Sequence, residues 1–464
     1  MLRFFRFNDP YRLIFVLATV ALLGIKAEFE VNKITLPEFH SVLVGEMMAD
    51  GKSMYSEVWH PMPPIAAFIQ YLHHLLFERS LVARHVTSML LIFFQASLLG
   101  ILLIANRAFN ENNYLPSFVF VFLAFFSFDT IGLTAELIGS TLLLVAMNNV
   151  LREIEFKRQR DETIHNLCFY LGLASLTVFS HVVFFFGVSF ILFAFTRVEF
   201  RRFGLYLIGF LLPHFFINLW YYHKGDIEWL WANFYLANID FSSQSLIEFR
   251  GLIILTALPL SYFFFSLVMM RRDARLTKYQ SQIAQVMFLW LLFGLIETYL
   301  NNQRTPQTLL VLVPPMSYFI SHYFLLIRRK WIAELMIWVF MAGILLVNSL
   351  SAKNIIPGFD TSKVCVQASN DVKFSGKKIL ILEDNLSPYL DNKTSSYFLD
   401  WKLSQTVFNE PDVYQHVLLV SDAFDADPPD IILDRKNSLK GFLPYLPKVR
   451  EKYRREGVYY FRMP

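Results

Sequence analysis

The residues best suited to chemistry gather in one polar stretch, residues 38–64, which follows the first long apolar segment. Such an apolar segment is typical of a membrane helix. Ionisable groups that lie close to a membrane without having to span it are a strong indication of function. A partly desolvated carboxylate such as Glu38 could act as a general base toward an incoming hydroxyl. A single loop acid is more often a solvated one, but this stretch adds three acids, a histidine and a proline pair: Glu46, Asp50, Glu57, His60, Pro63 and Pro64. Glu38 is therefore the leading candidate for a general base.

A second acid, Glu136, opens another apolar segment just after a turn near Asp129. The helix dipole alone would favour an acid there, so a capping role and a functional role explain it equally well. Two acids converging from different loops would suit acid–base chemistry or a divalent cation held by Glu38 and Glu136. The chain has no Cys/His cluster with zinc spacing and no Gly-rich phosphate loop. The sequence thus establishes no cofactor and leaves a divalent cation open.

Three cations could serve an anionic ligand near the same segments. Arg84 begins the second long apolar segment, Arg304 precedes Thr305-Pro306, and His60 lies in the polar stretch. A phosphate group needs such cations or a helix N-terminus to hold it. The alternative for the two arginines is snorkelling at the ends of spans, which is common.

The elements that must position these residues are apolar segments. Hydrophobic residues make up 55% of the chain and the mean hydropathy is +0.42, which a soluble core does not require. About eleven segments are long enough to be membrane helices. They lie at approximately 12–29, 82–105, 115–131, 133–151, 164–180, 182–196, 203–222, 251–270, 281–299, 308–327 and 331–350.

Basic residues fall on alternate loops between these segments. The clusters are Arg3/Arg6/Arg12, Arg107, Arg152/Lys157/Arg158/Arg160, Arg197/Arg201/Arg202, Arg271/Arg272/Arg275/Lys278 and Arg328/Arg329/Lys330. With eleven spans all of them face one side, which the positive-inside rule assigns to the cytoplasm. We therefore expect an uncleaved first span, a cytoplasmic N-terminus and a C-terminus on the opposite side. The positive charge sets membrane orientation and gives no indication of nucleic acid binding.

Two regions emerge from this layout. Residues 1–351 form the membrane part, including an outer loop, 29–81, whose segment 65–77 suits an interfacial helix. Residues 352–464 form a small non-cytoplasmic α/β domain. Its expected buried strands are 377–383, 416–420 and 429–434, followed by a helix over 438–455 and a closing strand at 458–461.

This layout resembles the GT-C superfamily of polytopic glycosyltransferases, which includes protein O-mannosyltransferases and the aminoarabinose transferases of lipid A. The resemblance rests on Glu38, the motif Gly51-Lys-Ser-Met-Tyr55, and the segments Pro63-Pro64-Ile65 and 77–84. It extends to Leu133-Thr-Ala-Glu136, to residues 305–315, and to the tail motif Pro429-Asp-Ile-Ile-Leu-Asp434. An acidic pair, common in the family, is replaced by Pro37-Glu38, and Met62 stands where a basic residue is frequent.

The resemblance implies an enzyme of the bacterial inner membrane, with the tail domain in the periplasm. Such an enzyme takes a sugar from a polyprenyl-phosphate donor and passes it to an acceptor on the outer face. Glu38 would be its general base, Glu136 would assist, and Arg84, Arg304 or His60 would hold the phosphate. A catalytically inactive scaffold or assembly partner in a cell-envelope complex, docking through residues 352–464, is the alternative. A transporter fits less well, because no paired Gly/Pro-broken helices occur in matching halves.

Overall fold

The computed structural model describes residues 2–5, 9–30, 34–155, 160–196, 199–239, 244–301, 303–358, 360–367 and 374–463. The chain divides into two compact units. The first comprises residues 1–38, 80–217 and 241–364, and the second comprises residues 39–79, 218–240 and 365–464. Each is described by itself.

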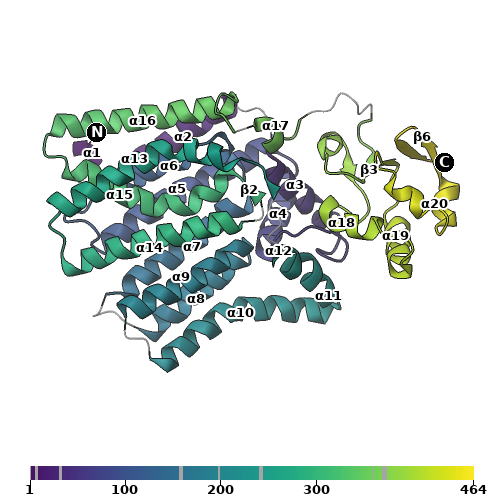
Figure 1. Cartoon of the computed structure of the whole chain (residues 1–464), viewed down its shortest axis with the longest axis horizontal. Coiled ribbons are helices and arrows are strands. Elements are labelled where there is room, and N and C mark those ends of the chain that lie inside the picture. The colour runs from purple at the N-terminus through teal and green to yellow at the C-terminus, as the bar shows by residue number, and fades with distance from the viewer. Residues whose placement is uncertain are drawn as a thin grey trace. The chain divides into compact units, whose positions relative to one another are not determined.

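The first unit is a bundle of long helices (Figure 1). Its main helices are α2 (Leu13–Glu30), α5 (Leu81–Ala105), α6 (Leu115–Ala124), α7 (Ala135–Glu153), α8 (Asp161–Ser175), α9 (Val182–Phe195), α10 (Phe200–Lys224), α13 (Phe249–Asp273), α14 (Lys278–Leu300), α15 (Val313–Leu326) and α16 (Lys330–Ala352). Short elements join them: α1 (Leu2–Phe5), α17 (Thr361–Val364), β1 (Gln244–Ser245), β2 (Gln303–Arg304), and the 3₁₀ turns η1 (Pro10–Arg12), η2 (Phe128–Ile131), η3 (Phe179–His181) and η5 (Pro306–Leu312).

Local sequence explains where several of these helices begin. The Ser80 hydroxyl accepts a hydrogen bond from the Ala83 amide at the start of α5. Thr277 and Gln280 form a reciprocal capping box at the start of α14. Apolar side chains then cover both the packed and the outward faces, as expected for membrane helices, because their outward faces contact hydrocarbon.

Each apolar segment expected from the sequence is largely helical, although turns at 125–127 and 176–178 divide two of them, and the prediction of a polytopic helical membrane protein is confirmed. Six helical stretches among the described residues are long and apolar enough to cross a membrane: 81–105, 200–224, 249–273, 278–300, 306–326 and 330–352. The expected number of eleven spans and the orientation stay predictions. Of the basic loop residues behind that orientation, Arg6, Lys157, Arg158 and Arg197 lie outside the described part of the chain.

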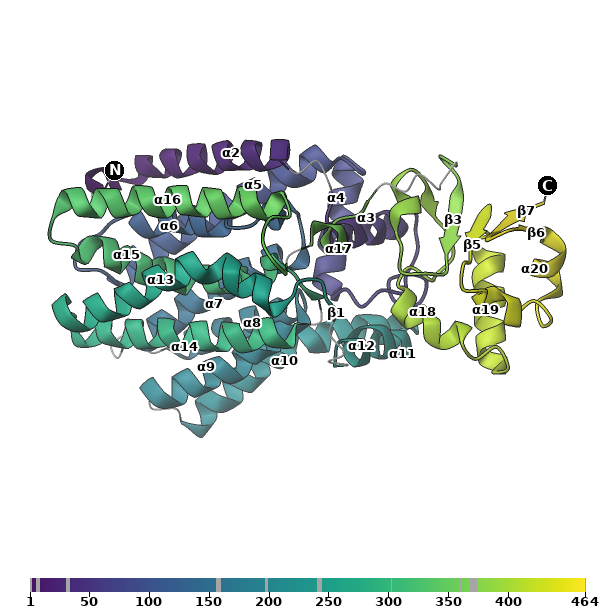
Figure 2. The same ribbon diagram turned by 45° about the horizontal axis from the view of Figure 1, so that its top comes forward.

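The second unit joins three stretches of sequence around a five-stranded sheet (Figure 2). The strand order is β4 (Lys393–Thr394), β3 (Lys378–Ile381), β5 (Ile431–Leu433), β7 (Tyr459–Arg462) and β6 (Tyr453–Glu456). The first three strands are parallel, and β7 and β6 are antiparallel additions. The accompanying helices and turns are most of α3 (Leu36–Ala49), α4 (Pro64–Phe77), α11 (Ile227–Leu230), the π-helical η4 (Trp231–Leu236), α12 (Ala237–Ile239), η6 (Ser387–Leu390), α18 (Trp401–Phe408), α19 (Tyr414–Ala426), η7 (Ser438–Gly441) and α20 (Pro447–Lys452).

One expected strand is wrong. Residues 416–420 lie in α19, although their continuous apolar run resembles a buried strand. The buried positions of α19 are Val420, Ala423 and Phe424, which have helical spacing and continue beyond the run, while Leu418 is exposed. The expected helix over 438–455 is also interrupted, since η7, α20 and the beginning of β6 share that range.

Candidate functional site

Glu38 lies in the first turn of α3 and is almost fully buried, with 1% of its surface exposed. Its Oε1 accepts hydrogen bonds from the Arg84 Nε, at 3.4 Å, and from the Leu133 backbone amide, at 3.3 Å. Arg84 closes the ring by donating through Nη2 to the Leu133 carbonyl, at 2.8 Å. The guanidinium is as buried as the carboxylate, so the two charges compensate each other away from solvent.

His85, next to Arg84 on α5, connects Glu38 with a second carboxylate. Its Nε2 lies 3.6 Å from the Glu38 Oε1, and its Nδ1 contacts the Glu28 carboxylate at the end of α2. The Glu28 side chain is 40% exposed, so a buried acid is connected through an imidazole to a solvent-accessible one. Burial opposes ionisation of Glu38, but the His85 hydrogen bond and the Arg84 charge outweigh it and lower the pKa of this carboxyl. Glu38 is therefore held as a buried carboxylate whose ionised form is favoured.

The loop that leads into α7 contacts Glu38 from the other side. A Cβ atom on Gly132 would lie 3.1 Å from the Glu38 Oε2, so the backbone approaches this carboxylate closely. Gln307 of η5 fixes the loop, donating from Nε2 to the Gly132 carbonyl, at 2.8 Å, and accepting from the Thr134 hydroxyl, at 2.8 Å. The Gln307 backbone amide donates to Asp129 Oδ2, at 3.0 Å.

Glu136 follows this loop in the first turn of α7 and is partly buried. Burial raises the pKa of Asp129 to about 7, and the nearby Glu136 charge acts in the same direction. A third acid, Glu297 near the end of α14, accepts a short hydrogen bond from the Ser180 hydroxyl and lies 3.8 Å from the His181 Nε2. The structure therefore connects Glu38 to the loop that leads into α7, and Asp129 and Glu297 are near Glu136 in the first turn of that helix.

The remaining two sequence candidates lie elsewhere. Arg304 is in β2, and its guanidinium lies over the Tyr299 ring at 5.0 Å from the ring centre. His60 belongs to the second unit, where its ring centre is 4.9 Å from that of His40. Burial, helped by the His40 charge, holds the pKa of His60 well below its usual range. A neutral imidazole offers a hydrogen bond but no charge to a phosphate.

The donor set does not fit a divalent cation. Among the described residues, no group of three or more His, Cys, Asp or Glu side chains could hold a metal ion. Glu38 already uses one oxygen for Arg84 and Leu133, and within the described part of the chain no third ligand joins Glu38 and Glu136 in a metal-binding group. We therefore derive no step through a metal.

Sequence reasoning missed His85, Glu28 and Glu297. An acid inside an apolar segment is costly, and this signal could have identified Glu297. His85 and Glu28 are separated by 57 residues, and only the packing of α2 against α5 brings them together.

No protein-family model and no curated protein sequence matches this chain. Its fold is similar to that of ArnT from Cupriavidus metallidurans bound to undecaprenyl phosphate, at a TM-score of 0.58 and 11% identity over 93% of this chain and 94% of that one. The apo state of the same ArnT gives a TM-score of 0.58 at 13% identity with the same coverage. An oligosaccharyltransferase from Archaeoglobus fulgidus gives 0.45 at 11% identity, over 96% of this chain and 73% of that one.

At such identities the likeness concerns the fold. It extends over both units of this chain and over nearly the whole of ArnT. The resemblance drawn from the sequence motifs is thereby confirmed at the level of architecture: the chain has a fold similar to that of ArnT.

Proposed function

We propose that this protein is a glycosyltransferase that moves a sugar from a polyprenyl-phosphate donor to an acceptor hydroxyl at the outer face of the membrane. The observation that carries the proposal is the buried, ionised Glu38 at the start of α3, held by Arg84 and joined to the loop before Glu136. The similarity to ArnT, which was crystallised with undecaprenyl phosphate, supports the class of donor.

In the proposed reaction the Glu38 carboxylate takes the proton of the acceptor hydroxyl. The acceptor oxygen attacks the anomeric carbon, the bond from that carbon to the phosphate oxygen breaks, and the polyprenyl phosphate leaves with the electron pair. Arg84 holds Glu38 in place and keeps it ionised. Glu136, in the first turn of α7, assists by positioning the acceptor.

Arg304 is the better of the two arginines for the donor phosphate. Arg84 is 2% exposed and already bonds Glu38 and the Leu133 carbonyl, so its charge is compensated. Arg304 is partly exposed and lies over the Tyr299 ring, and a partly exposed guanidinium can approach a phosphate in the fork geometry that arginine favours.

Glu38→Gln tests the proposal. The amide keeps an oxygen that can accept from Arg84 and Leu133, so the protein should fold, whereas Glu38→Ala would leave a buried guanidinium unpaired. In a strain that lacks the native gene, mass spectrometry of lipids, glycans and glycoproteins compares the variant with the wild type. We expect loss of one glycoform, a decrease of about a hundredfold or more for removal of a general base.

Glu162→Gln is the matched control, because Glu162 is an exposed acid at the start of α8, outside this network. It should leave the profile unchanged, and immunoblotting of membranes checks that both variants accumulate equally. An unchanged profile in Glu38→Gln, at normal protein level, would refute the catalytic role.

The second candidate function is a scaffold or assembly partner in a cell-envelope complex. Exposed apolar side chains in the 365–464 part of the second unit favour it: Val413, Tyr414, Leu418 and Tyr445. In that case Glu38 and Arg84 form a structural ion pair, the glycan profile does not respond to Glu38→Gln, and replacing Tyr414 and Leu418 by serine abolishes co-purification of a partner.

A further inference from the structure

A pocket of about 1200 Å³ with a mixed polar and apolar lining lies within the first unit, at the end of α5 opposite to the Glu38 site. It is lined by the end of α5 and the loop after it, the residues after α7, the end of α9 and the start of α14. Arg84, beside Glu38, lies near the beginning of α5, and Ile104, which lines the pocket, lies near its end. Twenty residues of α-helix separate them, which corresponds to about 30 Å, the thickness of a bilayer core.

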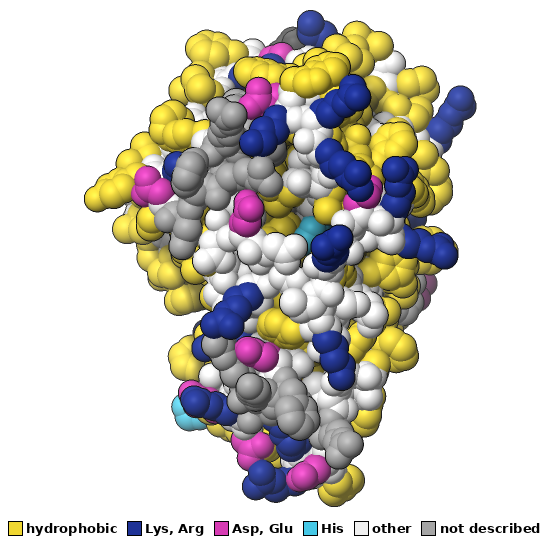
Figure 3. All heavy atoms as spheres, turned by 90° about the vertical axis from the view of Figure 1, so that its left-hand side faces the viewer, with side chains coloured by type: hydrophobic (Ala, Val, Ile, Leu, Met, Phe, Trp, Pro, Cys, Tyr) yellow, Lys and Arg dark blue, Asp and Glu magenta, His cyan; other side chains and the backbone are white. Residues whose placement is uncertain are grey.

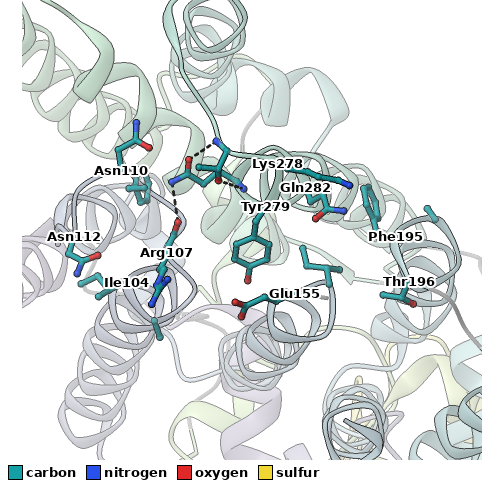
Figure 4. A pocket seen from close by; sticks show the side chains of 16 residues that line it. Ile104, Arg107, Asn110, Asn112, Glu155, Phe195, Thr196, Lys278, Tyr279 and Gln282 are labelled. Carbon is teal, nitrogen blue, oxygen red and sulfur yellow. Dashed lines mark hydrogen bonds between the residues drawn. The ribbon is translucent and has the colours of Figure 1, made fainter. Parts of the chain in front are cut away.

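The pocket combines charge with hydrogen-bond donors and an apolar wall. Arg107 and Lys278 supply two cations against one acid, Glu155, and amides from Asn112 and Gln282 add donors. Figure 4 shows Tyr279 and Glu155 between the side that carries Arg107 and the side that carries Lys278. Apolar side chains at the ends of α5 and α9 complete the lining. This mixture suits a ligand with an anionic, hydroxylated head and an apolar body.

Internal hydrogen bonds brace the frame and leave both cations available. Gln280, fixed by its capping box, donates to the Arg107 carbonyl at 3.2 Å. The Tyr279 hydroxyl donates to the Leu151 carbonyl at 2.8 Å. In the part of the chain that the structure describes, no ion pair engages the Arg107 guanidinium or the Lys278 ammonium, and both side chains are exposed.

Arg107 also stands where glycine is the usual residue. It follows the last turn of α5 with φ of 51°, and its amide donates to the Ile104 carbonyl at 3.0 Å. This left-handed position after a helix favours glycine, because a Cβ atom strains it. Because an arginine is unfavourable for the backbone at this position, we infer that its side chain has a function there.

The surrounding surface has the same sign. Figure 3 shows many Lys and Arg side chains over the end of the bundle where α5 ends and α14 begins. By the loop charges this end faces the cytoplasm, where anionic lipids are concentrated and basic pockets between membrane helices hold their headgroups.

We propose that this pocket binds the phosphodiester headgroup of an anionic membrane lipid in the cytoplasmic leaflet. Arg107 and Lys278 attract the phosphate, the amides bond headgroup hydroxyls, and the apolar wall accommodates the first part of the acyl chains. The site is independent of the proposed transfer reaction, since it lies at the opposite ends of the same helices.

The probe is phosphatidylglycerol, offered to the purified full-length protein in phosphatidylcholine nanodiscs and followed by native mass spectrometry. The double variant Arg107→Gln/Lys278→Gln removes the pocket cations, and Arg271→Gln/Lys330→Gln removes two exposed charges at helix ends outside the pocket. We expect the first to weaken phosphatidylglycerol binding about tenfold and the second less than about twofold. Equal losses in both would mean general surface attraction and would overturn the proposal.

Two further arms complete the test. If the double variant does not fold, Ala105→Trp fills the pocket and keeps every charge; it should weaken binding too, and wild-type binding in that variant overturns the assignment. Inorganic phosphate and a nucleoside diphosphate are then added as competitors. If they displace the lipid at concentrations near its own affinity, the pocket serves a soluble phosphate compound and the lipid assignment is wrong.

Discussion

At the scale of single residues, the chain from Glu38 through His85 to Glu28 offers a path for the proton that Glu38 would accept in the proposed reaction. A base that accepts a proton in a buried site must pass it on before the next cycle. His85 contacts both carboxylates, and Glu28 has access to solvent. Of the three residues, His85 alone carries one nitrogen toward each acid, so it can accept a proton on one side and release it on the other.

His85→Gln tests this relay. The glutamine amide can still donate to Glu38 but cannot carry a proton, so we expect kcat to fall about tenfold to a hundredfold with little change in KM. The pH profile of kcat should lose its acidic limb, since release through the imidazole no longer limits it. Thr87→Val, two residues further along α5, is the control. If KM rises while kcat is preserved, His85 has a structural role and does not relay a proton.

Asp129 predicts a pH effect on stability. Burial raises its pKa from 3.8 to about 7, so the folded protein holds a proton that the unfolded chain releases. Between these two pH values stability must therefore fall as pH rises, by on the order of 4 kcal/mol in total. Asp129→Asn removes this penalty, because the amide oxygen can still accept from the Gln307 backbone amide.

The measurement is the apparent melting temperature in detergent, followed by tryptophan fluorescence. The variant should melt above the wild type at pH 8 and at nearly the same temperature at pH 4. A constant difference at both pH values would show that Asp129 does not titrate in this range.

At the scale of elements, the α8–α10 crossing depends on glycine. A Cβ atom on Gly172 would lie 2.5 Å from the Phe210 carbonyl oxygen, a backbone atom that cannot move alone. Gly172→Ala should therefore separate the two helices and cost about 1–3 kcal/mol. Gly204, also on α10, has open space around its Cβ position, so Gly204→Ala should be neutral or stabilising by up to about 1 kcal/mol. Thermal inactivation of the two variants in detergent checks the contrast, and equal behaviour would contradict it.

The elements also show what the sequence could predict and what it could not. Long apolar runs such as those of α5, α13 and α14 predict helices, because a bilayer accepts few other structures. The position of Glu38 after the first span made it a candidate, because an ionisable group beside a membrane segment often has a function, and its role stays a prediction. The hydrogen-bond partners of Glu38 could not be predicted from the sequence, because Arg84 is 46 residues away and Leu133 is 95 residues away. The short run 416–420 misled because its four consecutive apolar residues, 417–420, fit a strand or a helix equally well.

At the scale of the molecule, the second unit depends on distant stretches of chain. Trp59, from the segment between α3 and α4, packs into the apolar core built by the 365–464 region. Its backbone amide donates to the Tyr397 carbonyl at 2.9 Å, and its carbonyl accepts from the Asp400 amide at 3.0 Å. Lys52 adds an ion pair with Asp427 at 2.5 Å. The sheet region is therefore completed by residues that precede it by more than three hundred positions, and we expect it to fold only with them.

Trp59→Ala tests this dependence. Its indole ring contacts Phe398 and Trp229, with ring centres 5.3 Å and 5.4 Å away, and the residue is 4% exposed. Removing it should cost about 3–5 kcal/mol of the stability of the second unit. Protease cleavage within residues 365–464 should then become faster, because cleavage follows the population of the opened state. Trp231→Ala, which removes a half-exposed indole from the same unit, is the matched control and should change the rate little. If both variants were cleaved at the wild-type rate, the 365–464 region would be stable without the Trp59 contact, and the interdependence argued for the second unit would be wrong.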